Sequence, residues 1–239
     1  VPHLISKPNY APLGGTIYAT GSYVNIYGGT VTGGISRTGT LLKVGSETET
    51  QKFEGTGGNI YAVNGSEVNI SGGVIENGYA DVYAGNLYAK DADVNISGGV
   101  IRGGATAGAS GNIQFGGPAT LSISGGTITG GACRTRGGNL FINDSNVSIE
   151  ITGGTINGDI SVGLFKAFKL SGAPKILMGN SNGLRLQRAT DANKDKDQVI
   201  DVSGLTEGAE IYLDGNRHNP VFTTVLENPE SYLPYFKEA

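Results

Sequence analysis

Aromatic side chains recur at one position of a repeated segment in this chain, usually two residues after an asparagine. The aromatic residues are Tyr18, Tyr61, Tyr88 and Phe141. A flat ring can stack on a sugar ring, and a neighbouring asparagine amide can hydrogen-bond to sugar hydroxyl groups. The pattern therefore predicts six glycan-binding residues, namely Tyr18, Asn59, Tyr61, Asn86, Tyr88 and Phe141. In the alternative interpretation, the aromatic rings brace a sheet by stacking across neighbouring strands.

The repeat that carries these residues has a period of 26 or 27 residues, because its copies begin at residues 57, 84, 110 and 137. The copy at 84–104 reads AGNLYAKDADVNISGGVIRGG, and an earlier copy occupies 14–34. Fixed periods of about 20–50 residues are typical of solenoids, propellers and arrays. The repeat therefore indicates an elongated, stacked architecture.

Each copy contains three short runs of alternating apolar residues, separated by glycine or polar residues, which is typical of β-strands. In the copy that begins at residue 57, these runs are 59–62, 68–71 and 74–76. Helical spacing is not sustained in any window. We therefore predict an all-β fold, a parallel β-helix with three strands per coil and about seven to eight coils.

Alternation along each strand predicts which side chains face the interior. In the first strand of a coil the inward residues include Ile60 and Ala62, and in the third strand they include Ile75 and Ile101. The residues between them are expected to face outward, and these include both the candidate tyrosines and the candidate asparagines.

We expect residues 1–239 to form a single domain. Its parts are regular repeats at 14–158 with an insertion at 35–55, degenerate coils at 159–215, and a C-terminal cap at 216–239. The start of the insertion could supply an extra strand, and its acidic end is typical of a projecting loop. The tail could form one short helix or simply lie over the open end of the solenoid.

The distribution of carboxylates argues against catalysis. Glycoside hydrolysis needs paired carboxylates at a fixed separation, and the repeat strands carry almost none. Glu76 and Arg102 share one outward column, where we interpret them as a cross-strand ion pair. His3 and His218 both lie near the termini and are poor candidates for a shared base. We therefore expect a non-enzymatic domain, with a polysaccharide lyase or glycoside hydrolase acting in a groove along the helix as the alternative.

The segment 191–197, DANKDKD, is similar to the first half of a calcium-binding loop. Its candidate metal ligands are Asp191, Asn193, Asp195 and Asp197. The segment departs from that pattern, because Lys196 replaces the expected glycine and Val202 replaces the expected glutamate. The alternative is an exposed polar loop. We expect no cofactor other than this candidate Ca²⁺.

Composition excludes several classes of partner. The formal net charge is −4 and there is no basic run, so we expect no nucleic-acid partner. No stretch approaches the roughly 18–20 apolar residues of a membrane span. A single cysteine, Cys133, rules out an intrachain disulfide, and we expect it to be a partly buried small side chain. The N-terminal residues lack signal-peptide character and look like a mature or trimmed start.

The strings GGNIY, VNISGGVI and NG resemble the right-handed parallel β-helix repeats of bacterial surface and secreted proteins, in the pectate-lyase-like group. The later string VIDVSGLTEGAEIYLDG is similar to the closing section of such domains in Gram-positive gut bacteria. The resemblance covers residues 14–236. It implies a right-handed coil, an extracellular or cell-surface location, and a place within a larger multidomain protein. The NTD, DD, GHG and RIK motifs of pectin-degrading hydrolases are absent from this sequence.

The repeat and the resemblance together predict an adhesion or ligand-binding domain. Its expected partner is a glycan or another host or cell-surface ligand. A purely structural spacer within a larger surface protein is a second alternative.

Overall fold

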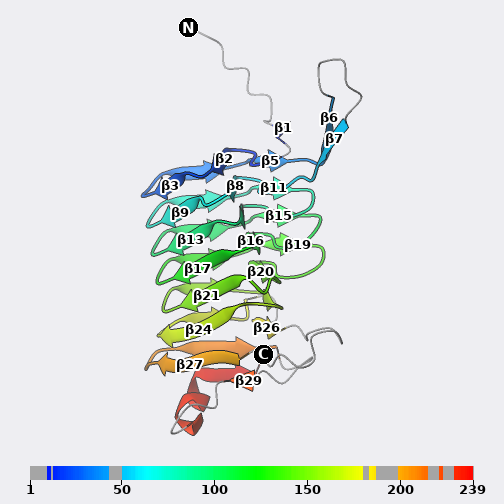
Figure 1. Cartoon of the computed structure of the whole chain (residues 1–239). Helices are drawn as coiled ribbons and strands as arrows, with labels where there is room; N and C mark the ends of the chain where they lie inside the picture. Colours follow the sequence, from blue (N-terminus) through cyan, green and yellow to red (C-terminus); the bar gives the residue numbers. More distant parts are fainter. Residues whose placement is uncertain are drawn as a thin grey trace, which may run out of the picture.

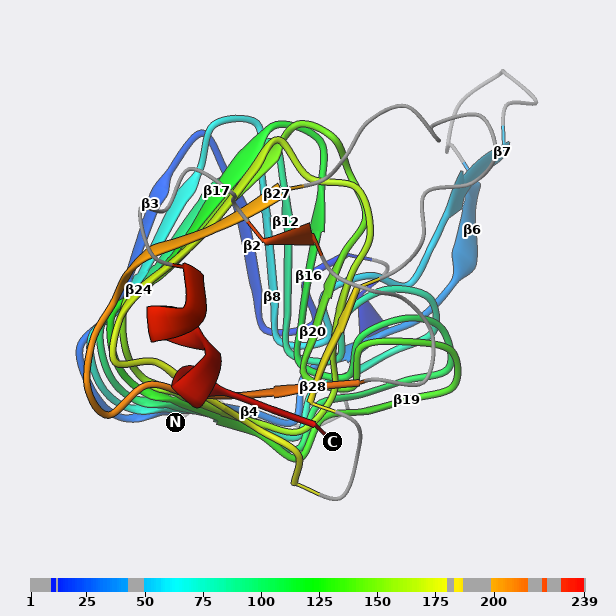
Figure 2. The same ribbon diagram turned by 90° about the horizontal axis from the view of Figure 1, so that it is seen from below.

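The computed structural model describes residues 10–11, 13–42, 50–179, 183–186, 199–214, 221–222 and 229–238. They form a parallel β-helix, with one coil stacked on the next along the molecule (Figure 1). In Figure 2, which looks from the C-terminal end, the chain runs counterclockwise as it approaches the viewer, and this is the right-handed sense. The predicted fold class is therefore confirmed.

Each regular coil contributes one strand to each of three parallel arrays, here called the first, second and third sheets. The first sheet contains β2 (Ile17–Thr20), β8 (Ile60–Val63), β12 (Leu87–Lys90), β16 (Ile113–Gly116), β20 (Leu140–Ile142), β23 (Ile160–Val162) and β26 (Leu184–Leu186). The second contains β3 (Tyr23–Ile26), β9 (Glu67–Ile70), β13 (Asp93–Ile96), β17 (Ala119–Ile123), β21 (Val147–Ile151), β24 (Ala167–Gly172), β27 (Val199–Leu205) and β29 (Val221–Phe222). The third contains β4 (Thr30–Thr32), β10 (Val74–Glu76), β14 (Val100–Arg102), β18 (Thr127–Thr129), β22 (Thr155–Asn157) and β25 (Lys175–Leu177).

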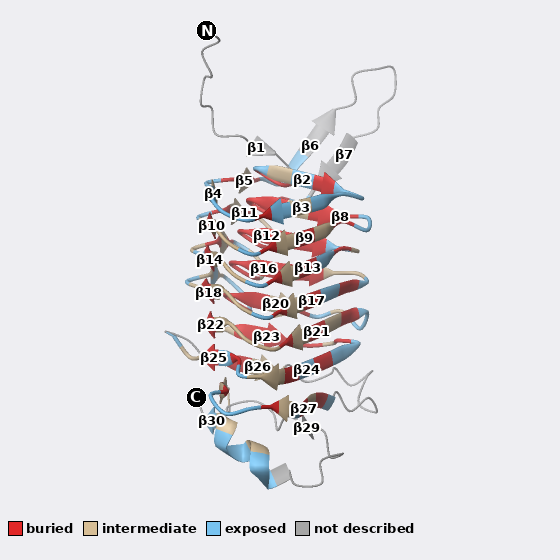
Figure 3. Cartoon of the chain, turned by 90° about the vertical axis from the view of Figure 1, so that its left-hand side faces the viewer, coloured by how far each residue is buried: buried red, intermediate tan, exposed pale blue. Residues whose placement is uncertain are grey.

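Apolar columns in strict register fill the interior of the helix. In the third sheet, Ile75 pairs with Ile101 and Ile101 with Ile128, and all three side chains are buried. Figure 3 shows buried residues running in columns from coil to coil. Full burial of such a side chain contributes roughly 1.5–3 kcal/mol, so stability accumulates as coils stack. The predicted inward columns are confirmed.

A smaller sheet forms a lobe on the side where the third strand of each coil returns to the first strand of the next (Figure 2). Its strands are β1 (Tyr10–Ala11), β5 (Ile35–Ser36), β11 (Tyr79–Ala80), β15 (Ala105–Thr106) and β19 (Ala132–Cys133). Residues 103–112 make one such connection, between β14 and β16, whereas only residues 158–159 connect β22 to β23. The lobe therefore stops after β19 while the main helix continues.

The insertion at 35–55 begins with β5 of the lobe and continues into an antiparallel hairpin of β6 (Gly39–Leu42) and β7 (Thr50–Phe53). This hairpin projects from the N-terminal end of the solenoid (Figure 1).

At the other end, β28 (Glu210–Leu213) pairs with both β25 and β26 and so joins the first and third sheets. The tail forms a short 3-10 helix, η2 (Pro229–Tyr235), followed by β30 (Phe236–Glu238), which pairs with β28. Tyr232 and Tyr235 of this helix pack against the core. Within the described parts of the chain, no helix is long and apolar enough to cross a membrane.

Candidate functional site

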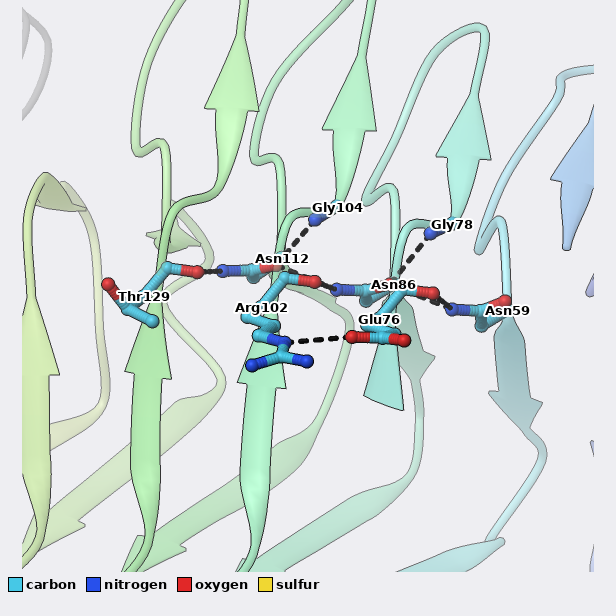
Figure 4. Close-up of polar contacts among 8 residues, drawn as sticks. All are labelled: Asn59, Glu76, Gly78, Asn86, Arg102, Gly104, Asn112 and Thr129. Atoms are coloured by element: carbon cyan, nitrogen blue, oxygen red, sulfur yellow. Dashed lines mark hydrogen bonds and ion pairs between the residues drawn. The ribbon is translucent and has the colours of Figure 1, made fainter. Parts of the chain in front are cut away.

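The candidate asparagines do not face outward, so that prediction was wrong. Asn59, Asn86 and Asn112 are completely buried, and Asn139 is 2% exposed. The first three amides each donate from Nδ2 to Oδ1 of the asparagine in the next coil, over 2.8 Å, 2.7 Å and 2.8 Å in turn, and Figure 4 shows the first two of these bonds. We call this row the asparagine ladder.

The ladder satisfies backbone groups at the neck of the lobe, where strand pairing is interrupted. Asn86 Oδ1 accepts a bond from the Gly78 amide at 3.0 Å, and its Nδ2 donates to the Arg102 carbonyl at 2.9 Å. The packing is tight, since a Cβ at Gly104 would clash with the Gly111 carbonyl oxygen. The amides are therefore engaged inside the protein, and Asn59 and Asn86 are not accessible to a ligand.

The alternation rule failed here because the asparagines precede the strands rather than belonging to them. Strand β8 begins at Ile60 and β12 begins at Leu87. Asn59 and Asn86 thus stand at the corner where the chain leaves the lobe, and period 2 does not extend through a corner.

The candidate tyrosines stack on one another, which is the arrangement that the bracing interpretation predicts. Ring centroids of Tyr18 and Tyr61 are 5.6 Å apart with an interplanar angle of 23°, and those of Tyr61 and Tyr88 are 5.5 Å apart at 3°. Because the rings are nearly parallel, their faces cover each other. Tyr61, in the middle of the column, therefore has a ring stacked on each of its two faces.

Exposure falls along this column from the first coil inward. Tyr18 is 52% exposed, Tyr61 is half-buried, and Tyr88 is only 9% exposed. Tyr83 of the lobe also stacks on Tyr88, at 5.7 Å and 19°. The expectation that Tyr88 faces solvent was therefore wrong, because the lobe covers it.

Burial raises the pKa of Tyr61 and raises that of Tyr88 further, with neighbouring tyrosines adding to both shifts. The raised pKa values keep both phenols protonated further into the alkaline range than an exposed tyrosine.

The column loses its aromatic character below Tyr88. Gln114 follows Tyr88 in register and Phe141 follows Gln114. Phe141 is half-buried, and Gln114 is 6% exposed. Gln114 Oε1 is shielded from solvent without a hydrogen-bond partner among the described residues. Phe141 thus lies in the predicted column but is separated from the tyrosine stack by one coil.

The outward column of the third sheet is polar. Arg102 Nε donates to Glu76 Oε2 at 2.8 Å, which confirms the predicted cross-strand ion pair (Figure 4). Thr129 and Asn157 continue this column in the next two coils. Arg102 is more than half exposed, so the pair lies on a solvated face and contributes little to stability.

The candidate calcium ligands Asp191, Asn193, Asp195 and Asp197 lie outside the described residues. In the part of the chain that the structure does describe, no group of three or more His, Cys, Asp or Glu side chains could hold a metal ion.

Asp159 terminates the lobe. Its Oδ2 accepts hydrogen bonds from the amides of Gly137 and Gly138, at 3.0 Å and 3.3 Å. In the first lobe connections the matching amides, those of Gly57 and Gly58, donate instead to carbonyl oxygens of the following lobe layer. The Asp159 carboxylate thus takes the place of the carbonyl oxygens that a further lobe layer would supply.

The end of the asparagine ladder lies beside this carboxylate. Asn139 Nδ2 donates to the Asn157 carbonyl at 2.8 Å, as earlier members donate to the matching carbonyls, but Asp159 stands where the next asparagine would follow. Asp159 Oδ1 is shielded from solvent, and Arg185 Nη2 lies 3.9 Å away. Arg185 also binds Asp214 at 2.8 Å, so this cation serves both acids.

A cavity of about 390 Å³ opens at this step between the lobe and the shorter coil below it. Its lining residues are Thr129, Gly130, Gly131, Asn139, Asn157, Gly158, Asp159 and Gly179. The cavity was not predicted from the sequence. The connection between the third and first strands shortens from 130–139 to 158–159, and this signal can be recognised once the lobe is known.

Cys133 in β19 is half-buried, as expected. Burial raises the pKa of its thiol, and the negative charge of Asp159 adds to that shift. The thiol is therefore protonated at neutral pH and a poor nucleophile.

Comparisons with protein-family models, with curated proteins and with solved structures found no match to this chain.

Proposed function

We propose that this chain is a non-catalytic binding domain of an extracellular or cell-surface protein and that its ligand is a glycan. The observation that carries the proposal is the tyrosine stack, whose end member Tyr18 is 52% exposed. Tyr61 covers one face of the Tyr18 ring. No second aromatic ring contacts it among the described residues, so its other face is a candidate platform for a sugar ring.

The stack favours binding because it fixes the platform before a ligand arrives. Tyr61 lies between Tyr18 and Tyr88, and Tyr88 is held by the lobe through Tyr83. A ring supported in this way loses little conformational freedom when a ligand stacks on it.

The carboxylates of the repeat favour a non-catalytic role, because several of them have structural partners. Glu76 pairs with Arg102, Glu150 pairs with Lys169 at 3.2 Å, and Asp159 accepts two backbone amides. A polysaccharide lyase or glycoside hydrolase is the rival, and a structural spacer without a ligand is the third candidate.

The location and the finer family are supported by the resemblance of the repeat to β-helix domains of bacterial surface proteins in the pectate-lyase-like group. In such a setting the solenoid would be one part of a larger protein, and its exposed end and faces would meet a host or cell-surface glycan.

The test is a glycan array probed with the wild-type chain and with two single variants. Tyr18→Ala removes the platform, whereas Tyr23→Ala removes a tyrosine of the same coil that is 75% exposed on the second sheet. We expect binding to fall only in Tyr18→Ala, with melting temperatures close to wild type in both. Equal binding by both variants would reject the platform, and product release from bound polysaccharide would favour the enzyme.

A further inference from the structure

We propose that the cavity below the lobe binds one neutral sugar residue, at a site separate from the tyrosine stack. This inference rests on the proposed glycan-binding function and adds a second contact for the same class of ligand. The cavity lies beside the third sheet between the fourth and fifth copies of the repeat, whereas Tyr18 belongs to the first sheet in the first copy.

The cavity is a consequence of the fold. Each earlier lobe layer is covered by the next one, through bridges such as the pairing of β11 with β15 and of β15 with β19. No described strand continues this sheet below β19, and residues 158–159 turn directly into β23. Among the described residues no further lobe strand covers the last layer, and Gly130, Gly131 and Asn139 at its neck line the cavity.

The size and the lining suit a small polar ligand. A volume of about 390 Å³ falls within the range of roughly 300–1,000 Å³ that is typical of small-molecule sites. The lining carries one hydroxyl group, two side-chain amides, a carboxylate and four glycines, and it includes no aliphatic or aromatic side chain. Such a surface offers hydrogen bonds in both senses and little apolar contact, which favours a polyhydroxylated group over an apolar one.

The charge balance favours a neutral ligand. Asp159 is the charged lining residue, and its carboxylate is already stabilised by two backbone amides and by Arg185. A phosphate would meet this carboxylate without a free cation in the lining, and a metal ion would find only one carboxylate. A sugar hydroxyl group needs neither.

Asn157 is the side chain best suited to hold such a ligand. Its backbone carbonyl ends the asparagine ladder, whereas its side-chain amide makes no hydrogen bond to another described residue. The amide offers a donor and an acceptor in one plane, which suits two adjacent hydroxyl groups. Gly179 leaves room for it, since a Cβ there would lie 3.0 Å from Asn157 Oδ1.

Gly130 provides the decisive substitution. It has φ of +65°, and Asn77, at the same repeat position, has φ of +56°, so asparagine is tolerated in this conformation. The side chain of Asn77 reaches the next coil, because its Oδ1 would meet a Cβ at Gly103. Gly130→Asn should therefore extend a side chain across the cavity toward Gly158.

The matched control is Gly33→Asn, which stands at the same repeat position with φ of +69° and open space around it, in the first copy. Calorimetric titration of the full chain with cellotriose, mannotriose, galactotriose and maltotriose is the measurement. We expect Gly130→Asn and Asn157→Ala to weaken binding of the recognised trisaccharide by about tenfold or more, while Gly33→Asn binds like wild type.

Three outcomes would overturn the inference. Unchanged affinity in Gly130→Asn and Asn157→Ala would show that the cavity does not bind the trisaccharide. If Tyr18→Ala alone then lost binding, the tyrosine stack would be the binding site and the proposed function would stand. Failure of wild type to bind any of the four trisaccharides, or binding of inorganic phosphate or Ca²⁺ that Gly130→Asn abolishes, would also reject a neutral sugar site. The glycan array decides separately whether the proposed function itself fails.

Discussion

At the scale of single residues, the same side chain has opposite roles at two positions of one repeat. Asn86 stands at the lobe neck and is buried in the asparagine ladder, whereas Asn95 lies on the outer face of the second sheet. Asn95 also bonds along the helix axis, with Nδ2 2.9 Å from Asn69 Oδ1. Burial, rather than residue type, therefore decides how much each amide contributes to the stability of the fold.

Replacing Asn86 by Ala should lower the free energy of unfolding by at least about 2 kcal/mol, because each buried polar group left without a partner costs about 1–3 kcal/mol. The substitution leaves one N–H of the Asn59 amide and the Gly78 N–H without an acceptor, and it removes one of two donors to the Arg102 carbonyl. Asn95→Ala is the control and should cost less than about 1 kcal/mol. Denaturant unfolding measures both, and equal losses would contradict the role assigned to the ladder.

We expect the buried phenol of Tyr88 to make the fold less stable at alkaline pH. Burial raises the pKa of its phenol in the folded protein above the usual value of 10.0. Above about pH 10 the unfolded chain releases this proton while folded Tyr88 keeps it, so unfolding becomes more favourable as pH rises. Thermal melts between about pH 9 and about pH 12, the range in which phenols titrate, should show a smaller fall in melting temperature for Tyr88→Phe than for wild type. Identical pH profiles for variant and wild type would refute this.

At the scale of elements, the three main strands of each coil could be predicted and the lobe could not. Ile60, Ile75 and Val68 are buried and alternate with less buried neighbours inside regular strands, where period 2 reports the face directly. The lobe strands have only two residues each, too few for alternation to show. Their pairing depends on the stacking of whole coils, which no single copy of the repeat reveals.

The candidate site was predicted only in part for a related reason. The stacking of Tyr18, Tyr61 and Tyr88 follows from their register and was predicted correctly. The burial of Tyr88 follows from Tyr83 of the lobe, and the cavity at Asp159 follows from the point where the lobe stops. Both depend on contacts between segments whose positions relative to one another cannot be predicted from the repeat pattern.

Asp159 should be required to protect the last layer of the lobe. In Asp159→Ala, the amides of Gly137 and Gly138 lose their acceptor, at a cost of about 1–3 kcal/mol in local stability. Hydrogen exchange should accelerate at residues 137–138. The amides of Gly57 and Gly58 serve as an internal control, because their acceptors are backbone carbonyls. Uniform acceleration at both places would show global destabilisation instead of a local cap.

At the scale of the whole molecule, the solenoid holds two candidate contact sites in fixed positions on different faces. The tyrosine stack belongs to the first sheet near the N-terminal end, and the cavity lies beside the third sheet below the lobe. Coil-to-coil hydrogen bonds and buried isoleucine columns connect them without a hinge within the regular repeats. A rigid body of this kind presents contacts without needing to close around a ligand.

We propose that the protein binds a glycan and leaves it intact. The most direct measurement is to capture oligosaccharides from a defined mixture on the immobilised full chain and to analyse bound and unbound fractions by mass spectrometry. We expect selective retention of a subset of saccharides, recovered with unchanged length and mass. Recovery of shortened or unsaturated products would contradict the non-catalytic assignment, and retention of no saccharide would contradict glycan binding.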